Sequence, residues 1–365
     1  MGTTINQTDL SPCLLMQERS IKYFGQLAAD SNKPFTGLLD ALKSPINKIA
    51  MQLTDDVNNG QVAPTGTNKR QVQIRYIKPT CADEVDVEVS ECNDPIRNAN
   101  ALGFAKFEID DFVSFGFSLT DDQFNEMCAG RDEIYMENFQ TKYYNALKRL
   151  DKKLLNLILG YMGNYPNGTS SATAPIEIPL IKGDKTPNIG AFAEILKLYR
   201  IMGYSASPIW VGDNDLEILN IMKQFLSVGN DGIDMSKLMM DRFFYDGQVN
   251  ATLGGGTEKI VATFAPGTFQ LVEYLDSDRK TIADYKDVYI NNIRTVRYKE
   301  QKVTMALPDG NWEFYYKYDC GQHIYNLQKR FGLFAMPEDA VCVNKYPALL
   351  FKVGCGEVDC TTDFF

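Results

Sequence analysis

The chain has 365 residues, which corresponds to roughly two and a half domains of average size. Hydrophobic residues make up 44% and charged residues 23%, a balance that excludes intrinsic disorder as the main state. The formal net charge of −10 argues against a protein that coats phosphate backbones, and the single histidine, His323, excludes paired-histidine metal sites and leaves one possible imidazole base.

Residues 1–66 are predicted to form an N-terminal arm of short helices. Ser11-Pro12 and Ser44-Pro45 each place a capping hydroxyl before a proline that suits the first helical position. The run from Asp55 to Gly66 contains turn formers and little to bury, as in a linker. Such an arm has few core residues of its own, so it must pack on the body of the same subunit or on a neighbour.

Residues 67–103 are predicted to form a two-stranded hairpin. Apolar residues alternate with polar ones over 71–76 and again over 85–89, and Pro79 to Asp83 supplies the turn. The first strand and its flank are basic, whereas Asp83 to Asp94 carries six acids and no base, so opposite charges favour this pairing. An ordinary half-buried hairpin and an extended hairpin laid over an adjacent subunit both fit this pattern.

A strand and then a long helix are predicted next. Phenylalanines alternate over 104–118, and Thr120 to Gln123 fits a capping box. From Asp132 to Met162 no proline occurs and apolar residues recur every three or four positions, which predicts about 45 Å of helix. The charged residues at 148–153, Asp151 among them, are assigned to its solvent face. We expect this helix to lie as a one-sided spine against a sheet.

The second half of the chain alternates between helix and strand after a loop at 163–190, which predicts a compact α/β domain. The predicted helices and strands are a helix from Ile189 to Gly203, strand Pro208–Gly212, a helix capped by Asp213, and strands Ile260–Phe264 and Phe269–Leu275, the last two joined by a type II turn. From Val288 onward the pattern is mostly β, with strands on either side of Pro308–Gly310 and another at Val341–Phe351.

No phosphate-binding or nucleophile motif is complete. Gly163 to Thr169 has the glycine spacing of a P-loop but lacks its lysine and follows a helix, and Gly254 to Lys259 matches no dinucleotide motif. Cys320 and His323 are three residues apart, so they face opposite sides if their segment is extended. No catalytic or cofactor-binding residue is therefore assigned.

Metal sites are also unsupported by spacing. Three acidic clusters lack the loop pattern of a calcium site: Asp213/Asp215/Glu217, Asp231/Asp234 and Asp276/Asp278. The eight cysteines form no CxxC pair, and without a signal peptide they are expected to be reduced thiols. The alternative is a tetrahedral zinc site formed by Cys320, Cys342, Cys355 and Cys360. No apolar run approaches the length of a membrane span.

The order of these elements resembles the major capsid proteins of tailed bacteriophages, whose Johnson fold is shared with encapsulins. Three segments also resemble phage coat sequences: Pro208–Leu219, Phe264–Tyr274 and Val303–Tyr325. The resemblance implies an α+β phage capsid fold. Its parts would be an N-terminal arm (1–66), an extended E-loop hairpin (67–103), a peripheral domain with a spine helix (104–184), an α/β axial domain (185–310), and returning strands with a C-terminal tail (311–365).

The same resemblance implies a structural protein of the virion with no enzymatic activity and no cofactor. Copies would assemble as pentamers and hexamers, in the cytoplasm of a bacterial host, into an icosahedral shell that encloses double-stranded DNA without reading its sequence. Scaffold, portal and decoration proteins are further candidate partners, and a membrane is not. We expect Arg75, Lys78, Asp86 and Glu88 to help set the register between subunits. The alternatives are a tail or tail-tube subunit, an encapsulin-like compartment shell, and a cytosolic metal-dependent enzyme.

Overall fold

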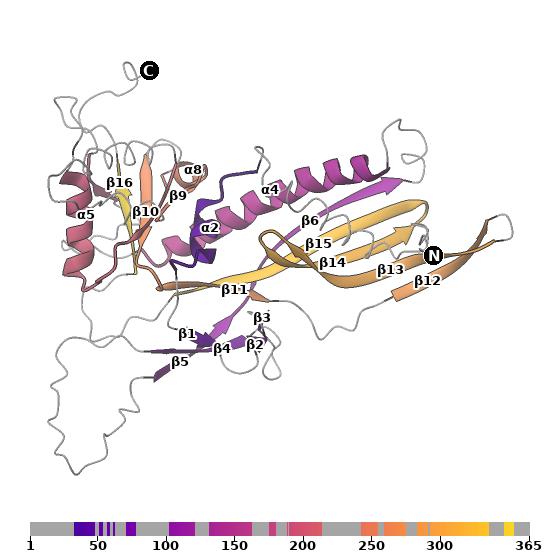
Figure 1. Cartoon of the computed structure of the whole chain (residues 1–365), viewed down its shortest axis with the longest axis horizontal. Coiled ribbons are helices and arrows are strands. Elements are labelled where there is room, and N and C mark those ends of the chain that lie inside the picture. Colours follow the sequence, from indigo (N-terminus) through magenta and orange to yellow (C-terminus); the bar gives the residue numbers. More distant parts are fainter. Residues whose placement is uncertain are drawn as a thin grey trace, which may run out of the picture.

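The computed structural model describes part of the chain in full and part as backbone only. Side chains are described for 33–47, 109–120, 136–162, 175–179, 188, 190–191, 193–213, 242–254, 259–273, 304–335 and 347–353. Backbone alone is described for 51–53, 57–58, 61–62, 71–77, 102–108, 131–135, 192, 274, 283–290 and 293–303. Helices and strands occur together throughout, so the fold is α+β (Figure 1).

The largest sheet is long and mostly antiparallel. Its strands, in spatial order, are β12 (Ala283–Ile290), β13 (Ile293–Leu307), β14 (Gly310–Asp319), β15 (Gln322–Ala335), β11 (Phe269–Tyr274), β3 (Gln61–Val62) and β2 (Val57–Asn58). An eighth strand, β6 (Asp111–Thr120), pairs with β15. The 14-residue β15 pairs first with β14 and then with β11, while residues 322–331 of the same strand pair with β6. This single strand therefore links the elements at the two ends of the sheet.

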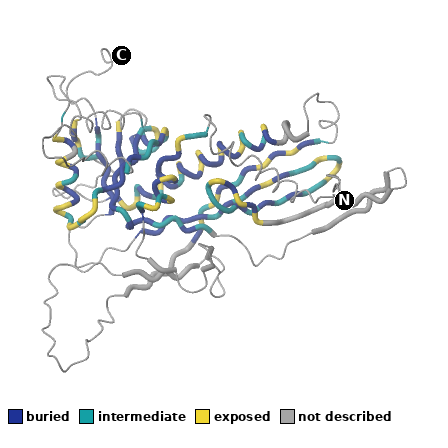
Figure 2. The backbone as a smooth tube through the Cα atoms, viewed as in Figure 1, coloured by how far each residue is buried: buried dark blue, intermediate teal, exposed yellow. Residues whose placement is uncertain are grey.

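Helix α4 (Arg131–Leu159) runs along this sheet for 29 residues, or about 43 Å. Its apolar side chains at three- and four-residue spacing are buried from Phe139 to Ile158, and in β6 the alternate residues from Val113 to Leu119 are buried too (Figure 2). The long helix that the sequence predicted is confirmed. Within the described residues, no helix combines the length and the apolar character needed to cross a membrane.

A second, smaller sheet lies at one end of α4 (Figure 1). Its order is β7 (Ile176–Glu177), β16 (Ala348–Lys352), β10 (Ile260–Phe264), β8 (Ile209–Gly212) and β9 (Phe243–Tyr245). Residues of one face, such as Trp210 and Val261, form a core with α5 (Gly190–Ile201). Residues of the other face join the core around α4, beside which α8 (Val249–Leu253) also packs.

The turns that end two of these elements match the sequence prediction. Gly203 follows α5 with a φ of 81°, and Gly267 has a φ of 80° between β10 and β11. Such positive φ values favour glycine, which has no Cβ to clash with the backbone.

A third sheet shows where the predicted strand pairing is wrong. It has the order β1 (Met51–Leu53), β4 (Gln71–Ile77) and β5 (Leu102–Glu108), so both edges of β4 are paired. The sequence predicted residues 85–89 as the partner of this strand; they lie outside the described residues. The predicted strand over 104–118 is in fact two, because β5 joins β4 and β6 joins β15, with buried Ile109 between them. The local charge pattern did not determine the pairing.

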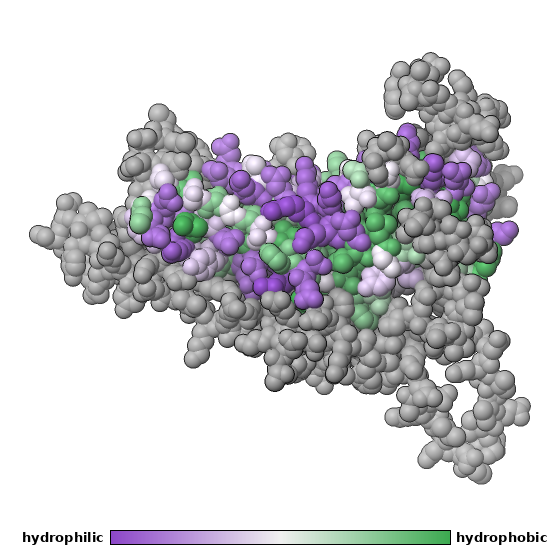
Figure 3. All heavy atoms as spheres, turned by 180° about the vertical axis from the view of Figure 1, so that it is seen from behind, coloured by the Kyte–Doolittle hydropathy of each residue, from purple (hydrophilic) through white to green (hydrophobic). Residues whose placement is uncertain are grey.

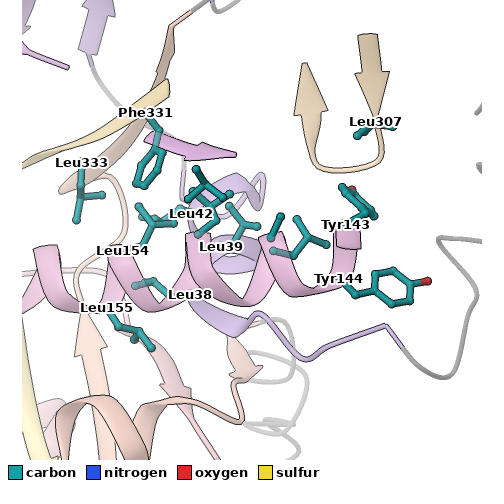
Figure 4. Close-up of a cluster of buried hydrophobic side chains, with 14 of the residues drawn as sticks. Leu38, Leu39, Leu42, Tyr143, Tyr144, Leu154, Leu155, Leu307, Phe331 and Leu333 are labelled. Carbon is teal, nitrogen blue, oxygen red and sulfur yellow. The ribbon is translucent and has the colours of Figure 1, made fainter. Parts of the chain in front are cut away.

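Helix α2 (Gly37–Lys43) belongs to the predicted arm but is part of the chain's own core. Figure 4 shows Leu38, Leu39 and Leu42 among side chains of α4 and β15, and Leu38 has no exposed surface. The sequence left open whether the arm packs on its own subunit or on a neighbour, and α2 packs in the body of its own chain. Ser44 ends this helix with a ψ of 141°, because the residue before a proline is driven to an extended conformation. Its hydroxyl accepts a hydrogen bond from Ile46 N at 3.3 Å, but residues 45–47 form a turn and not the predicted helix.

Candidate functional site

The four residues predicted to set intersubunit register are largely outside the described part of the chain. Arg75 lies in β4, where the backbone alone is described, and Lys78, Asp86 and Glu88 are not described. Their role stays a prediction.

The predicted alternatives for metal binding are described only in fragments. The carboxylate of Asp213 accepts a hydrogen bond from Asn250 Nδ2 at 3.3 Å, and Cys320 is an exposed free thiol. The other members of these clusters lie outside the described residues, and so does the P-loop-like segment 163–169. Among the residues whose side chains are described, no three His, Cys, Asp or Glu side chains gather as a metal site would require.

His323 packs among tyrosines at the end of the β14–β15 hairpin. Its Nδ1 lies 2.9 Å from the hydroxyl of Tyr316, and its ring is 4.9 Å from the ring of Tyr318. Cys320 occupies the turn with a φ of 46°, followed by Gly321. The hydrogen bond and ring contacts give His323 a structural role in this hairpin.

The structure brings together buried charges that the sequence did not connect. Asp309, in the turn between β13 and β14, receives three side-chain donors. Tyr143 donates to its Oδ1 at 2.6 Å, Trp312 Nε1 donates to the same oxygen at 2.9 Å, and Lys329 Nζ donates to Oδ2 at 2.7 Å. The turn is therefore held beneath α4 and against β15.

Two further groups extend this site, which we call the Asp309 network: Lys43, Tyr143, Glu273, Asp309, Trp312 and Lys329. Glu273 Oε1 lies 3.1 Å from Lys329 Nζ and 2.8 Å from Lys43 Nζ, and Lys43 also donates to the carbonyl of Asp309. The ammonium of Lys329 lies 5.0 Å from the ring centre of Trp312. The network thus joins α2, α4, β11, β14 and β15.

The lysines determine the charge state of Asp309. Burial alone would raise the pKa of this carboxyl group, but Lys329 and Lys43, with the hydrogen bonds from Lys329 and Tyr143, hold the pKa below its ordinary value of 3.8. Burial, followed by the repulsion from Lys329, lowers the pKa of Lys43. The carboxylate is therefore ionised and paired with cations in the folded chain.

Gly310 is required where the network approaches the backbone. Its φ is 117°, and a Cβ at this position would lie 2.9 Å from Glu273 Oε2 and 3.2 Å from Lys329 Nζ. A side chain at this position would be strained by its backbone conformation and would collide with the ion pair.

A second buried site, the Asp151–Asp246 pair, lies at the other end of α2. Leu39 N donates to Asp151 Oδ1 at 3.0 Å and Leu38 N donates to Asp246 Oδ2 at 3.2 Å, while neither aspartate has exposed surface. No described N–H or O–H group donates to Asp151 Oδ2. A protonated carboxyl group of Asp151 would carry its hydrogen on this oxygen.

Burial and a neighbouring acid act in the same direction on the pKa of Asp151. Burial, followed by the hydrogen bond and charge of Asp246, raises the pKa of Asp151 well above 3.8. Asp40 in α2 is a further acid nearby, and burial raises its pKa against the opposing effect of Lys33 and Lys43.

The sequence prediction for Asp151 is wrong, and its position shows why. The prediction placed it on the solvent face of the helix with its charged neighbours, yet the structure buries it. It lies four residues after Leu147 and three before Leu154, within the apolar stripe of α4, so its spacing carried a signal that its charge concealed.

Among known proteins, the chain is similar only to solved structures. No family model matches the chain, and no curated protein does. Over most of its length the chain is similar to structures from phages. One from Mycobacterium phage Adephagia is 11% identical, with a TM-score of 0.43, over 94% of this chain and 98% of that one.

Two more of these structures are described as capsids. The mature capsid of bacteriophage PhiM1 is 11% identical over 80% of this chain and 83% of its own, with a TM-score of 0.39. The capsid of cyanophage P-SCSP1u is 10% identical over 84% of this chain and 90% of its own, also with a TM-score of 0.39. These values record a likeness to phage capsid structures and are too low to assign a function.

Proposed function

We propose that the chain is the major capsid protein of a tailed phage and that its copies assemble into an icosahedral shell around double-stranded DNA. The observation that carries the proposal is the position of β4 and β5. These strands pair with each other, are separated by 24 residues, and directly precede β6 and the long helix α4. A long hairpin connection before a spine helix is the order that the capsid resemblance implies.

The domain assignment follows from this order. The E-loop of residues 67–103 would be rooted in the β4–β5 pair, and α4 would be the spine helix of a peripheral domain at 104–184. The smaller sheet with α5 would be the axial domain, assigned to 185–310, and the returning segment 311–365 contributes β16 to it. The arm, residues 1–66, would be anchored to its own subunit through α2.

The buried acids support a structural role over an enzymatic one. Asp151 and Asp246 have no exposed surface, and the side chain of Asp309 is 7% exposed. Acids that water barely reaches are poorly placed to meet a substrate or a soluble metal ion. Their partners are backbone N–H groups and side chains of the same fold, so their chemistry serves the stability of the subunit.

The proposal is tested on the purified full chain by light scattering after size-exclusion chromatography, with negative-stain microscopy. Closed shells or five- and six-fold rings support a capsid protein. Helical tubes would favour a tail-tube subunit, against which the 29 residues of α4 argue because that class is mostly β. A monomer that hydrolyses a substrate when a divalent metal is added would overturn the proposal in favour of an enzyme.

The four register residues offer a sharper test. Asp86→Lys with Glu88→Lys should prevent shell formation while far-UV circular dichroism and the melting temperature stay unchanged. The matched control adds Arg75→Glu and Lys78→Glu, which restores the opposite charges and should restore assembly. Normal shells from the Asp86/Glu88 variant would contradict this role for the E-loop.

A further inference from the structure

The solvent face of α4 is positively charged although the chain as a whole carries a net charge of −10. Five cations lie within twelve residues of the helix, and we call them the α4 stripe: Lys142, Lys148, Arg149, Lys152 and Lys153. All are exposed except Lys153, which is half-buried. From residue 136 to the end of α4, the acids are exposed Glu137 and Asp151, which points into the core.

The geometry of α4 holds these cations on one side of the molecule. The opposite face of the helix packs on β6 and β15. Exposed and buried residues therefore alternate along the length of α4 (Figure 2). At a rise of 1.5 Å per residue the stripe is about 17 Å long. Hydrophilic residues also gather over the middle of the face that Figure 3 shows.

The cations at the edge of the stripe are positioned by β6. Arg149 donates to the carbonyl of Ser114 at 2.7 Å, and Lys153 donates to that of Phe112 at 3.0 Å and pairs with Asp111 at 3.4 Å. Within the described residues, the side chains of Lys142, Lys148 and Lys152 are not paired with an acid. These three ammonium groups are therefore exposed to solvent and accessible to a ligand.

The composition of the stripe favours a polyanion over a protein partner. Protein interfaces are enriched in aromatic residues, Met and Arg and are depleted of Lys. Between Glu137 and Asn156, however, every exposed side chain of α4 is polar; besides the cations these include Thr141 and Asn145. Lysine, arginine, asparagine and threonine are the side chains that bind phosphate oxygens.

We propose that the α4 stripe binds the phosphate backbone of double-stranded DNA without reading its sequence. Along 17 Å a DNA duplex presents on the order of ten phosphates, which exceeds the five cations available. The acidic remainder of the chain repels DNA, but its effect is largely screened beyond about 10 Å at moderate salt. The biological setting rests on the proposed function, because a shell would present many copies of the stripe to the enclosed genome.

The experiment measures binding of a short labelled DNA duplex to the unassembled full chain by fluorescence anisotropy over a range of salt concentrations. The test variant is Lys148→Gln with Lys152→Gln; the control is Lys197→Gln with Arg200→Gln, an equal loss of charge at exposed positions of α5. The wild-type protein and the control should bind with a Kd on the order of 10⁻⁴ to 10⁻⁶ M at physiological salt, and more tightly at lower salt. In the test variant the slope of log affinity against log salt should shrink by about 1.8, because each lost contact contributes about 0.9.

Equal affinity and slope for the test variant and the wild-type protein would overturn the proposal, and so would an absence of wild-type binding at low salt. A test variant that binds DNA normally but no longer forms shells would also overturn it, because the stripe would then be a protein interface. Shell formation is measured in parallel. A chain that binds DNA through the stripe but never forms shells would refute the capsid proposal alone, and shells without DNA binding would refute the stripe alone.

Discussion

The two buried acid sites hold opposite ends of α2 and differ in the sign of their neighbours. At the Asp309 network, Lys329 and Lys43 compensate for the cost of burial, and the acid stays ionised. At the Asp151–Asp246 pair, the neighbour is another acid, and burial and repulsion together favour a protonated carboxyl group. Burial raises the pKa at both sites; the cations beside Asp309 reverse this effect, whereas the second acid beside Asp151 adds to it.

This difference gives each site its own mode of failure. A buried ion pair whose cation is removed leaves a charge that has lost both water and partner. A buried Asp151 that ionises beside another acid gains a charge that burial and repulsion both disfavour, so this site weakens as the pH rises. The predictions below test this contrast, from the largest expected effect to the smallest.

Replacing Lys329 with Met should have the largest effect on stability. The side chain of Lys329 is 1% exposed, so its removal takes the cation that binds the carboxylate of Asp309 and leaves Glu273 with Lys43 alone. We expect the free energy of unfolding, measured with urea, to fall by about 3–5 kcal/mol. Lys317→Met is the control, since it removes an exposed pair with Asp319 and should cost less than about 1 kcal/mol. Equal losses in the two variants would show that burial does not strengthen the network.

Gly310→Ala should have the next largest effect. The substitution combines a strained φ with a methyl group 2.9 Å from Glu273 Oε2, and we expect a cost of about 2–3 kcal/mol. Gly321→Ala is the milder control: Gly321 has a φ of 79°, closer to the left-handed region that other residues adopt, and no described atom lies within 4 Å of the added Cβ, so it should cost about 1 kcal/mol. If both variants melt at the same temperature, the steric contact with the network is unimportant.

The effect of Asp151→Asn on the free energy of unfolding should depend on pH, and Asn should become more favourable relative to Asp as the pH rises. Because the pKa of Asp151 is raised on folding, the folded chain binds more protons than the unfolded chain above the ordinary value of 3.8. The stability that this group contributes is therefore complete below 3.8 and is lost as the pH rises through the pKa of the folded state. Urea unfolding at several pH values should show Asn becoming more favourable relative to Asp as the pH rises, by about 1.4 kcal/mol for each unit of the shift.

Asp309→Asn provides the opposite control. The pKa of Asp309 is lowered on folding, so its contribution is present above 3.8 and is lost as the pH falls through the lower pKa of the folded state. The advantage of Asp over Asn at position 309 should thus disappear in acid. Parallel pH profiles for the two Asn variants would contradict the assignment of opposite protonation states.

The sequence predicted local elements well and failed where distant segments meet. The periodicity of α4 and the glycine after α5 depend on residues close in sequence, and both were confirmed. The turn at Pro308–Gly310 was also predicted, but its composition is that of an exposed turn. The residues near Asp309 in the sequence do not predict that Lys43, Tyr143 and Lys329 surround it, because these three residues lie in separate elements far along the chain. The partner of β4 was missed for the same reason.

Asp111→Asn should have the smallest effect on stability and still sharpen the comparison. Asp111 and Lys153 form an ion pair in which the two side chains are 37% and 42% exposed, so water screens both charges. The free energy of unfolding should change by less than about 0.5 kcal/mol. The same substitution removes the negative charge beside Lys153, which keeps its hydrogen bond to the carbonyl of Phe112, so the affinity for a DNA duplex should rise about twofold at low salt and by less at high salt. A large loss of stability would mean that exposed pairs behave like the Asp309 network, and unchanged DNA affinity would remove Lys153 from the stripe.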